Sequence, residues 1–502
     1  MLDTSEIRRE FPYLNRTIAL QIRNEEEKRT SLDNTASTQV PLPVLETILK
    51  ASFDYANVHR GEYNASQKTT EAFERAYNIA ANLVNADSWR EIILGRSTTE
   101  MINLVARSLA PQFRDGDNVV VTRMEHNSNY VPWFALSQDA ARNERKVDVR
   151  VVDFDKATGE LDMDQMADYV DERTKLVGCT GASNFLGTKP NLQEVSEIAH
   201  GSDYTQPDGT RGSYFLVDGA QLVPGCPVDV KETDCDFLAW SFHKMLVPFG
   251  VGGLYGKKQI LEQMEPFLHG GDMVEDVSEG KVTYKPLPWK FTAGTPNILG
   301  TIAAGAGINF LINAGLGNTD RRNKDKLKRQ IETEILLNTQ RGDFPINFTV
   351  PQENQELFAE YLETNPERYE MLKDPEARLD EVRRTVRNSM ENIMQHEQEL
   401  TARALRGLER IPNVTIYGPR RAEDRTALVA FTLKGILSST AAKLFNKTGL
   451  EFRNGTLCAS LAHKHHGLTD GSVRMGMYIY NTPAEIDTAL EVIEKTARGE
   501  NK

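Results

Sequence analysis

The chain has 502 residues, which is too long for one small core and predicts two or three structural units. Its content of 39% hydrophobic and 26% charged residues is ordinary for a soluble globular protein. The formal net charge of −13 argues against a general nucleic-acid-binding protein, which needs basic clusters to neutralise phosphates. The four cysteines show neither metal-ligand spacing nor a disulfide framework, so we expect a reducing compartment and no metal site.

The N-terminal ten residues are charged where a signal peptide would be apolar. The most apolar stretch, 302–316, is interrupted by Asn309 and Asn313 and is too short to span a bilayer. We therefore expect a cytoplasmic protein with no membrane partner.

Short β-branched runs alternate with helical patterns between about residues 31 and 300. The strand-like runs lie at 91–94, 118–122, 147–154, 175–178, 214–217, 236–240 and 251–256. Strands that are separated by helices predict a mostly parallel sheet with helices on both faces. We therefore place a large α/β domain at residues 31–318.

The remaining sequence predicts three further units. After residue 317 the chain is densely charged, with an apolar, strand-prone interlude at 344–350 and helices predicted at 366–373 and 374–387. From 393 a helix leads into strand-like runs, and a final helix starts at Pro483. The predicted units are an N-terminal segment (1–30) packing with the small domain, a charged, mainly helical insertion (319–392), and a small C-terminal α/β domain (393–502).

Two predicted buried strands end in side chains with complementary chemistry. Asp218 follows the run 214–217, and Lys244 follows the run 236–240. A pyridoxal phosphate enzyme needs both groups. Its lysine forms a Schiff base with the cofactor aldehyde, and its acid holds the pyridinium nitrogen protonated. The pair predicts a pyridoxal phosphate enzyme.

Other polar residues also fall at the carboxyl ends of predicted strands, where open parallel sheets bind ligands. Ser97 and Glu100 have the spacing of a capping box at the start of a helix, and free N–H groups at such a helix start can bind a phosphate. Ser241 and His243 could donate to the same phosphate or could simply end a strand. His126 could stack on the pyridine ring, although a lone histidine is more often structural.

Ten short segments carry a resemblance to a known family. They are 32–37, 58–61, 96–106, 125–129, 183–188, 217–221, 241–244, 293–297, 453–459 and 474–482. In order and spacing they resemble the class V aminotransferases of the cysteine desulfurase and selenocysteine lyase group. The resemblance implies a homodimer of pyridoxal phosphate fold type I, with a mostly parallel sheet in a large α/β/α domain and a smaller C-terminal α/β domain.

The resemblance also implies a role for individual residues. Lys244 would form the Schiff base, Asp218 would pair with the pyridinium nitrogen, and His126 would stack on the ring and move protons. The other implied cofactor-binding residues are Asn184 and Gln221 at the phenolic oxygen, Thr98, Thr99, Ser241 and His243 at the phosphate, and Thr295 from the second subunit. Arg474 would hold the substrate carboxylate, and Asn34, Arg453 and His59 are expected to contact substrate.

Cys458 decides the reaction type that the resemblance implies. In the desulfurases a mobile cysteine attacks the substrate sulfur and leaves as a persulfide, with release of alanine. Cys458 lies in an Arg-x-Gly-x-x-Cys-Ala sequence of that type, and its loop, 455–471, is expected to be mobile. The histidines and lysine at 463–466 could lower the thiol pKa. Cys179, Cys226 and Cys235 are assigned as buried apolar residues.

The chain departs from the family pattern at 456–457, at 201–212 and at 319–392. We expect an enzyme that cleaves the C–S bond of L-cysteine to give alanine and a persulfide on Cys458, with a sulfur-acceptor protein as a further partner. The alternatives are a C–S β-lyase, a selenocysteine lyase or an amino-acid epimerase of the same fold. The intact set of Lys244, Asp218, His126 and Arg474 opposes a non-enzymatic scaffold.

Overall fold

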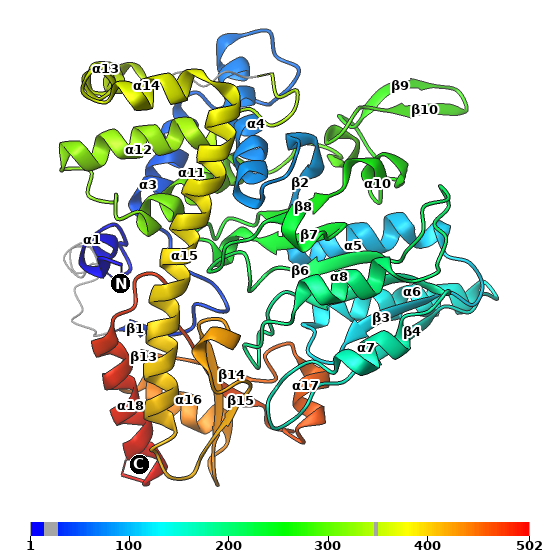
Figure 1. Cartoon of the computed structure of the whole chain (residues 1–502), viewed down its shortest axis with the longest axis vertical. Coiled ribbons are helices and arrows are strands. Elements are labelled where there is room, and N and C mark those ends of the chain that lie inside the picture. Colours follow the sequence, from blue (N-terminus) through cyan, green and yellow to red (C-terminus); the bar gives the residue numbers. More distant parts are fainter. Residues whose placement is uncertain (1, 15–28, 346–349, 501–502) are drawn as a thin grey trace.

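The computed structural model describes residues 2–14, 29–345 and 350–500, and Figure 1 shows the arrangement of the elements. Residues 1 and 15–28 of the predicted N-terminal segment (1–30) and residues 346–349 of the interlude 344–350 therefore lie outside the described residues. A long helix, α15 (Pro375–Leu408), runs along one side of the molecule, and the largest sheet lies beside it.

The central sheet has seven strands in the order β2-β8-β7-β6-β5-β3-β4. Only β8 runs antiparallel to its neighbours, so the prediction of a mostly parallel sheet is confirmed. The strands are β2 (Ile92–Gly95), β3 (Asn118–Thr122), β4 (Asp148–Val152), β5 (Thr174–Thr180), β6 (Tyr214–Asp218), β7 (Phe237–Ser241) and β8 (Gly252–Gly256).

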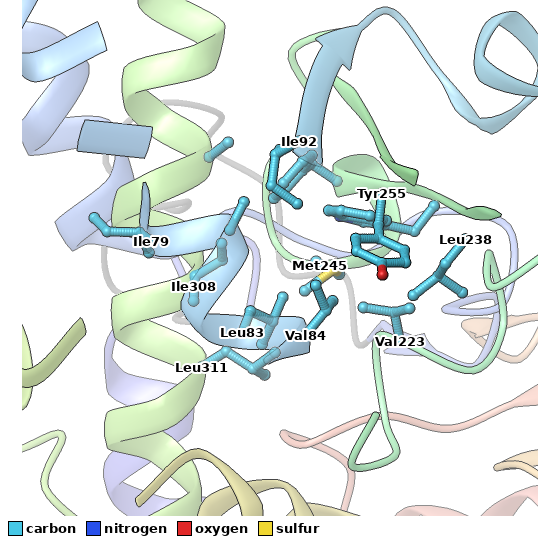
Figure 2. Close-up of a cluster of buried hydrophobic side chains, with 14 of the residues drawn as sticks. Ile79, Leu83, Val84, Ile92, Val223, Leu238, Met245, Tyr255, Ile308 and Leu311 are labelled. Carbon is cyan, nitrogen blue, oxygen red and sulfur yellow. The ribbon is translucent and has the colours of Figure 1, made fainter. Parts of the chain in front are cut away.

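Alternate residues of each central strand enter different hydrophobic cores. In β3, Val120 packs into one core while Val119 and Val121 pack into the other, as the two-residue period of a strand requires. The first core lies against α3 (Leu42–Phe53), α4 (Asn64–Val84), α7 (Met163–Tyr169), α8 (Leu192–His200) and α11 (Ile298–Gly315), and the second against α5 (Thr98–Leu109), α6 (Val131–Arg142) and α10 (Lys258–Gln263). Figure 2 shows part of the first core, where α4 and α11 meet the sheet.

Helix α11 contains the apolar stretch 302–316. By length and composition it could cross a membrane, but 83% of it is buried inside the protein. It packs against α3, α4 and α15. A helix that is apolar on all sides is expected at the centre of a large core, which is where α11 lies.

The small domain is built on a four-stranded antiparallel sheet in the order β11-β12-β15-β14. Its elements are β11 (Val414–Tyr417), β12 (Leu428–Leu433), β14 (Arg453–Gly455), β15 (Ser472–Gly476), α16 (Ser438–Asn446), α17 (Ser460–His465) and α18 (Pro483–Ala497). The N-terminal segment contacts this domain where it is described. In helix α1 (Thr4–Arg9), Arg8 bonds Tyr480 and Glu485, and β1 (Thr30–Ser31) pairs with β13 (Leu450–Glu451).

The helical insertion and the small domain share one element. After α12 (Lys324–Leu337) and α13 (Gln355–Thr364), helix α14 (Pro366–Lys373) has the predicted bounds, but α15 runs without a break across the expected boundary between 392 and 393. No glycine or proline interrupts residues 376–406, so nothing in the sequence ends the helix there. The predicted helix 374–387 is therefore only the first part of α15, and no linker separates the two units.

A β-hairpin was missed by the sequence analysis. Strands β9 (Val274–Ser278) and β10 (Lys281–Tyr284) are joined at Gly280, whose φ of +76° suits a tight turn, and they project from the large domain (Figure 1). Most of its residues are exposed, so the hairpin lacks the alternation of apolar and polar residues by which a half-buried strand is recognised.

Candidate active site

A cavity of about 340 Å³ lies beyond the carboxyl ends of β3, β5, β6 and β7, and the small domain closes it. It brings together twelve of the predicted residues, which are Thr98, Thr99, His126, Asn184, Asp218, Gln221, Ser241, His243, Lys244, Arg453, Cys458 and Arg474. The large domain supplies nine of these, and β14, β15 and the turn after β14 supply the last three.

Lys244 and Asp218 occupy adjacent strand ends. Lys244 ends a short 3-10 helix that follows β7, and Asp218 is the last residue of β6. Burial lowers the pKa of Lys244 to about 8, although the Asp218 carboxylate opposes the shift. Burial raises the pKa of Asp218, while the Ala220 amide, which donates to Oδ1 over 3.0 Å, and Lys244 favour its charged form. A depressed pKa increases the fraction of lysine that is present as the free amine, which is the form that a nucleophile needs.

His126 is held as a neutral ring. Its Nδ1 accepts a hydrogen bond from the Ser128 amide over 3.1 Å, so the ring proton is on Nε2. Burial, together with the charges of Lys244 and Arg474, lowers the pKa of His126 to about 4. The Ser128 hydroxyl lies 2.8 Å from Nδ1 and 2.6 Å from the Thr99 hydroxyl, which connects the ring to the start of α5.

The start of α5 forms a cluster of neutral hydrogen-bond donors. Thr98 donates through its backbone N–H to the Ser241 hydroxyl over 2.7 Å, and burial lowers the pKa of His243 to about 4. Only half of the expected capping box is present, because Ser97 accepts from the Glu100 amide while Glu100 accepts from Arg96. Free N–H groups and hydroxyls at a helix N-terminus fit a phosphate group.

Strand β8 runs directly beneath this helix start. A Cβ atom on Gly252 would lie 2.5 Å from the backbone of Ser97. Only glycine therefore permits the close contact that fixes the phosphate end of the cavity against the sheet.

The two amide side chains each donate to a backbone carbonyl. Asn184 and Gln221 are expected to hydrogen-bond the phenolic oxygen of the cofactor. In the structure they line the cavity and donate to the carbonyls of Leu457 and Thr35, over 2.6 and 2.9 Å. The Asn184 Oδ1 atom is buried and has no partner among the described residues. An unpaired buried acceptor beside a cavity indicates that a bound molecule supplies the missing donor.

Arg474 and Arg453 lie at the small-domain side of the cavity. Arg474 is buried, donates to the Asn184 carbonyl over 2.8 Å, and has an unpaired Nε. Burial lowers its pKa to about 10, so it is still charged at neutral pH. Asp33 lies 2.6 Å from Arg453 and 3.7 Å from Arg474. Its single negative charge balances only one of the two arginines, so the group keeps a net positive charge that can bind a carboxylate. These contacts of Asp33 were not predicted, because residues 32–37 served only to establish the resemblance to the family.

Cys458 is an exposed, free thiol on the short turn between β14 and α17. It and Leu457 both have left-handed backbone conformations, with φ of +54° and +53°. The Cys458 carbonyl accepts from the Asn127 amide over 2.7 Å. The loop 455–471, which was expected to be mobile, therefore contains the helix α17 and a turn that is hydrogen-bonded to the large domain.

The histidines after Cys458 face away from the cavity. His463 is buried, stacks 3.9 Å from the Phe185 ring centre and bonds Ser472, and burial lowers the pKa of His466 to about 4. The cations that share the cavity with the thiol are instead Lys244, Arg453 and Arg474. The other three cysteines are buried, as predicted, and burial raises the pKa of each one.

Three predicted residues lie outside the cavity. Asn34 bonds the Gly476 carbonyl, Asn481 and Tyr480, so its amide is used to join the N-terminal segment to the small domain. His59 contacts Asp272 over 3.2 Å and packs against Trp289, with the two rings tilted by 56° and their centroids 4.4 Å apart. Within this chain neither residue is available to substrate. Thr295 is exposed.

Other lining residues were not predicted. They are Thr35, Ala36, Ser97, Ser128, Thr180, Ala182, Ala220 and Leu457. Several directly adjoin predicted residues, so proximity to the strand ends was the signal that could have identified them.

Comparison with known proteins places this site in a family. The aminotransferase class-V family matches residues 30–365 and 379–489. The chain belongs to this family. It is therefore a pyridoxal phosphate-dependent enzyme, and the neutral donors at α5, the pair of Lys244 and Asp218 and the unpaired Asn184 oxygen fit that cofactor.

Relatives and solved structures match nearly the whole chain. A probable cysteine desulfurase from Synechocystis sp. is 33% identical over 98% of this chain and 95% of its own length. A cysteine desulfurase from Haloferax volcanii is 31% identical over 98% and 96%. The apo structure of a cysteine desulfurase from Thermococcus onnurineus NA1 superposes with a TM-score of 0.75, at 27% identity over 99% of both chains.

Proposed function

We propose that this enzyme is a cysteine desulfurase, which converts L-cysteine to alanine and a persulfide on Cys458. The observation that carries the proposal is the free, exposed Cys458 thiol, which lines the same cavity as Lys244 and Arg474. The names of the relatives support the same reaction.

Each end of the cavity has a distinct task in this proposal. Pyridoxal phosphate, bound by the α5 donors, Asp218 and Lys244, supplies a ring that withdraws electrons from the substrate Cα. Arg474 binds the substrate carboxylate and so fixes which bonds face the sheet. The neutral ring of His126 lines the cavity and would donate through Nε2 to a molecule bound there.

Two residues carry out the chemical steps. Lys244, as a free amine, takes the proton from the substrate Cα. The Cys458 thiolate attacks the substrate sulfur, so an S–S bond forms as the C–S bond breaks. The electron pair of the broken bond stays with the carbon fragment, which takes up one proton at Cβ and a second at Cα, the latter returned by Lys244, and leaves as alanine. The left-handed turn presents the thiol at the open side of the cavity, where a sulfur acceptor can reach it.

The product separates this proposal from its alternatives. Purified enzyme is incubated with L-cysteine, and alanine, pyruvate and sulfide are measured. Alanine, formed with persulfide on the protein, supports the desulfurase. Pyruvate with ammonia identifies a β-lyase and overturns the proposal, whereas racemised cysteine identifies an epimerase. A parallel incubation with selenocysteine compares selenium with sulfur.

We also propose that the enzyme is a homodimer in the cytoplasm and passes its sulfur to an acceptor protein. The exposed position of Thr295 and the exposed valines of the hairpin, Val277 and Val282, support a second subunit at that surface. Four unpaired cysteines support a reducing compartment. Light scattering coupled to size-exclusion chromatography tests the dimer, and a monomeric mass with full activity would contradict it.

A further inference from the structure

A buried carboxyl group joins two of the strand ends that form the active-site cavity. Glu125 follows β3 and is 1% exposed. Its Oε1 atom accepts from the Thr122 hydroxyl over 2.6 Å, at the end of β3, and from the Thr180 amide over 2.8 Å, at the end of β5. The pairing of these two strands ends at Val121 and Gly178, so the carboxyl group continues the contact between them beyond that point.

The other carboxyl oxygen holds the far end of the turn 126–129, which follows Glu125 in the chain. Oε2 accepts from the Asn129 side chain over 2.7 Å. The orientation of this amide is fixed, because its Oδ1 atom accepts from the Trp133 indole over 3.1 Å. Glu125 thus receives three donors, and the amide among them cannot reverse without losing the bond to Trp133.

The three bonds persist whether the carboxyl group of Glu125 is charged or neutral. Burial raises its pKa to about 8, while the three hydrogen bonds oppose the shift and the charge of Asp218 adds to it. A protonated carboxyl group still accepts at both oxygens, because its hydroxyl oxygen keeps a lone pair. The contacts of Glu125 therefore do not depend on its protonation state.

The turn 126–129 contacts three parts of the active site. His126 lines the cavity. The Asn127 amide donates to the Cys458 carbonyl over 2.7 Å. Ser128 reaches the start of α5 through its hydroxyl. Because one short turn carries all three contacts, a shift of this turn changes the positions of the His126 ring and of Cys458 together.

We propose that Glu125 is a positioning residue that fixes the turn 126–129 and, through it, the alignment of the His126 ring with the Cys458 thiol. The inference deepens the proposed function and rests on it, because a desulfurase needs its thiol aligned with the substrate sulfur. An error of about 1 Å in such an alignment costs on the order of 10²-fold in rate.

The test starts from Glu125→Gln, loaded with cofactor and without substrate. The new side chain keeps an acceptor for Thr122 and Thr180, but its NH₂ group faces the NH₂ group of Asn129. Because Asn129 is held by Trp133, it cannot turn to offer its oxygen. The turn therefore loses its anchor, and two buried donors are left without an acceptor.

Hydrogen–deuterium exchange, measured by mass spectrometry, follows both sides of the contact. Segment 123–130 contains the Asn127 amide, and segment 456–461 contains the Ser460 amide, which donates to Oδ1 of Asn127 over 3.5 Å. In Glu125→Gln the exchange should speed up at least about tenfold in both segments. A role confined to the packing around Glu125 would leave segment 456–461 unchanged.

The bound cofactor and the kinetics give two further readouts. Visible circular dichroism reports the surroundings of the cofactor ring, so its signal should change in Glu125→Gln as the His126 ring shifts. With cysteine as substrate, kcat should fall on the order of 10–100-fold, because the thiol is misaligned. KM should stay within about twofold of the wild-type value, because Arg474 does not lie on this turn.

A double variant, Glu125→Gln with Asn129→Asp, exchanges the acid and the amide between the two positions. The amide at position 125 then donates to the acid at position 129, which still accepts from Trp133. Exchange in both segments should return to within about threefold of the wild-type rates. Such a recovery assigns the effect to this one hydrogen bond rather than to a general loss of stability.

Glu91→Gln is the matched control. Glu91 is also buried, and its carboxyl group also accepts from three amides, those of Asp87, Ser88 and Lys258. It lies at the start of β2, at the opposite edge of the sheet from the cavity. Exchange in segments 123–130 and 456–461 and the circular dichroism of the cofactor should stay as in the wild type.

Two results would overturn the inference: a folded Glu125→Gln with wild-type exchange in segment 456–461, or a double variant no closer to the wild type than the single one. If Glu125→Gln does not fold, Asn129→Ala removes the same bond from its other end and decides in its place. The exchange measurements need no substrate. A wild type that makes no alanine would therefore refute the proposed function while the coupling through Glu125 is still decided.

Discussion

The two halves of the active site are built in different ways. The sheet half places Asp218 at the end of β6, which is paired with strands on both sides, and Lys244 on the 3-10 helix that directly follows β7. The small-domain half places Cys458 on an exposed turn with two left-handed residues. Cofactor chemistry needs fixed groups, whereas a residue that carries sulfur outward needs exposure to solvent. The same cavity therefore combines a rigid wall with an accessible one.

Lys244→Ala should give the largest effect on the rigid half. Without the amine, no covalent link to the cofactor can form and no residue takes the Cα proton. We expect activity to fall by at least about 10⁴-fold. In the wild type, borohydride reduction followed by peptide mapping should find the pyridoxyl group on Lys244. A reduced cofactor on another lysine would refute the assignment.

Cys458→Ala tests the exposed half alone. The variant should bind the cofactor with the absorption spectrum of the wild type, because the cofactor contacts lie on the sheet side. It should form almost no alanine, since the substrate sulfur has no acceptor. Quantitative amino-acid analysis measures the product, and Cys226→Ala is the matched control at a buried cysteine. Full alanine formation by Cys458→Ala would exclude the thiol as nucleophile.

Asp218→Asn should reduce activity on the order of 10²–10³-fold while the protein still folds. The amide keeps the shape of the acid but cannot hold the charge that stabilises a protonated ring nitrogen. Steady-state kinetics should show the loss in kcat rather than in KM. Near-normal turnover would mean that another acid performs this task.

The smallest expected effect concerns His126 and pH. Its folded pKa of about 4 lies below the ordinary 6.5, so the unfolded chain binds a proton there that the folded chain does not. This stability contribution is complete above pH 6.5 and is lost as the pH falls towards 4. When the pH falls from 7 to 5, the free energy of unfolding of the cofactor-free wild type should decrease by up to about 2 kcal/mol more than that of cofactor-free His126→Asn. Urea denaturation measures the difference, and parallel losses would contradict it.

The sequence predicted the rigid half better than the accessible half, and the reason is physical. Buried strands such as β3 and β6 are runs of β-branched and aromatic residues, and a ligand site follows wherever such strands end. The tethering of Cys458 depends on hydrogen bonds from Asn127 and Asn184, which lie more than 270 residues away in sequence. No local pattern reports such contacts.

The positions of Asn34 and His59 follow the same rule. Both lie in segments that resemble the family, but their partners, Asn481 and Asp272, come from distant parts of the chain. The burial of Glu397 was not predicted, because it depends on how α15 packs against the small domain and the loop after β6.

The 34 residues of α15 form a rod about 50 Å long. Its first half packs with α11, α12 and α14, and its second half packs with α18 and β12. Because a continuous helix resists bending, the small domain cannot tilt over the cavity without moving the helices at the far end of the rod. A partner protein that binds α13 and α14 would thus affect the side of the cavity that carries Cys458 and Arg474 without contacting it. Removal of those helices would leave the first half of α15 without the packing of α14, although α11 and α12 would remain.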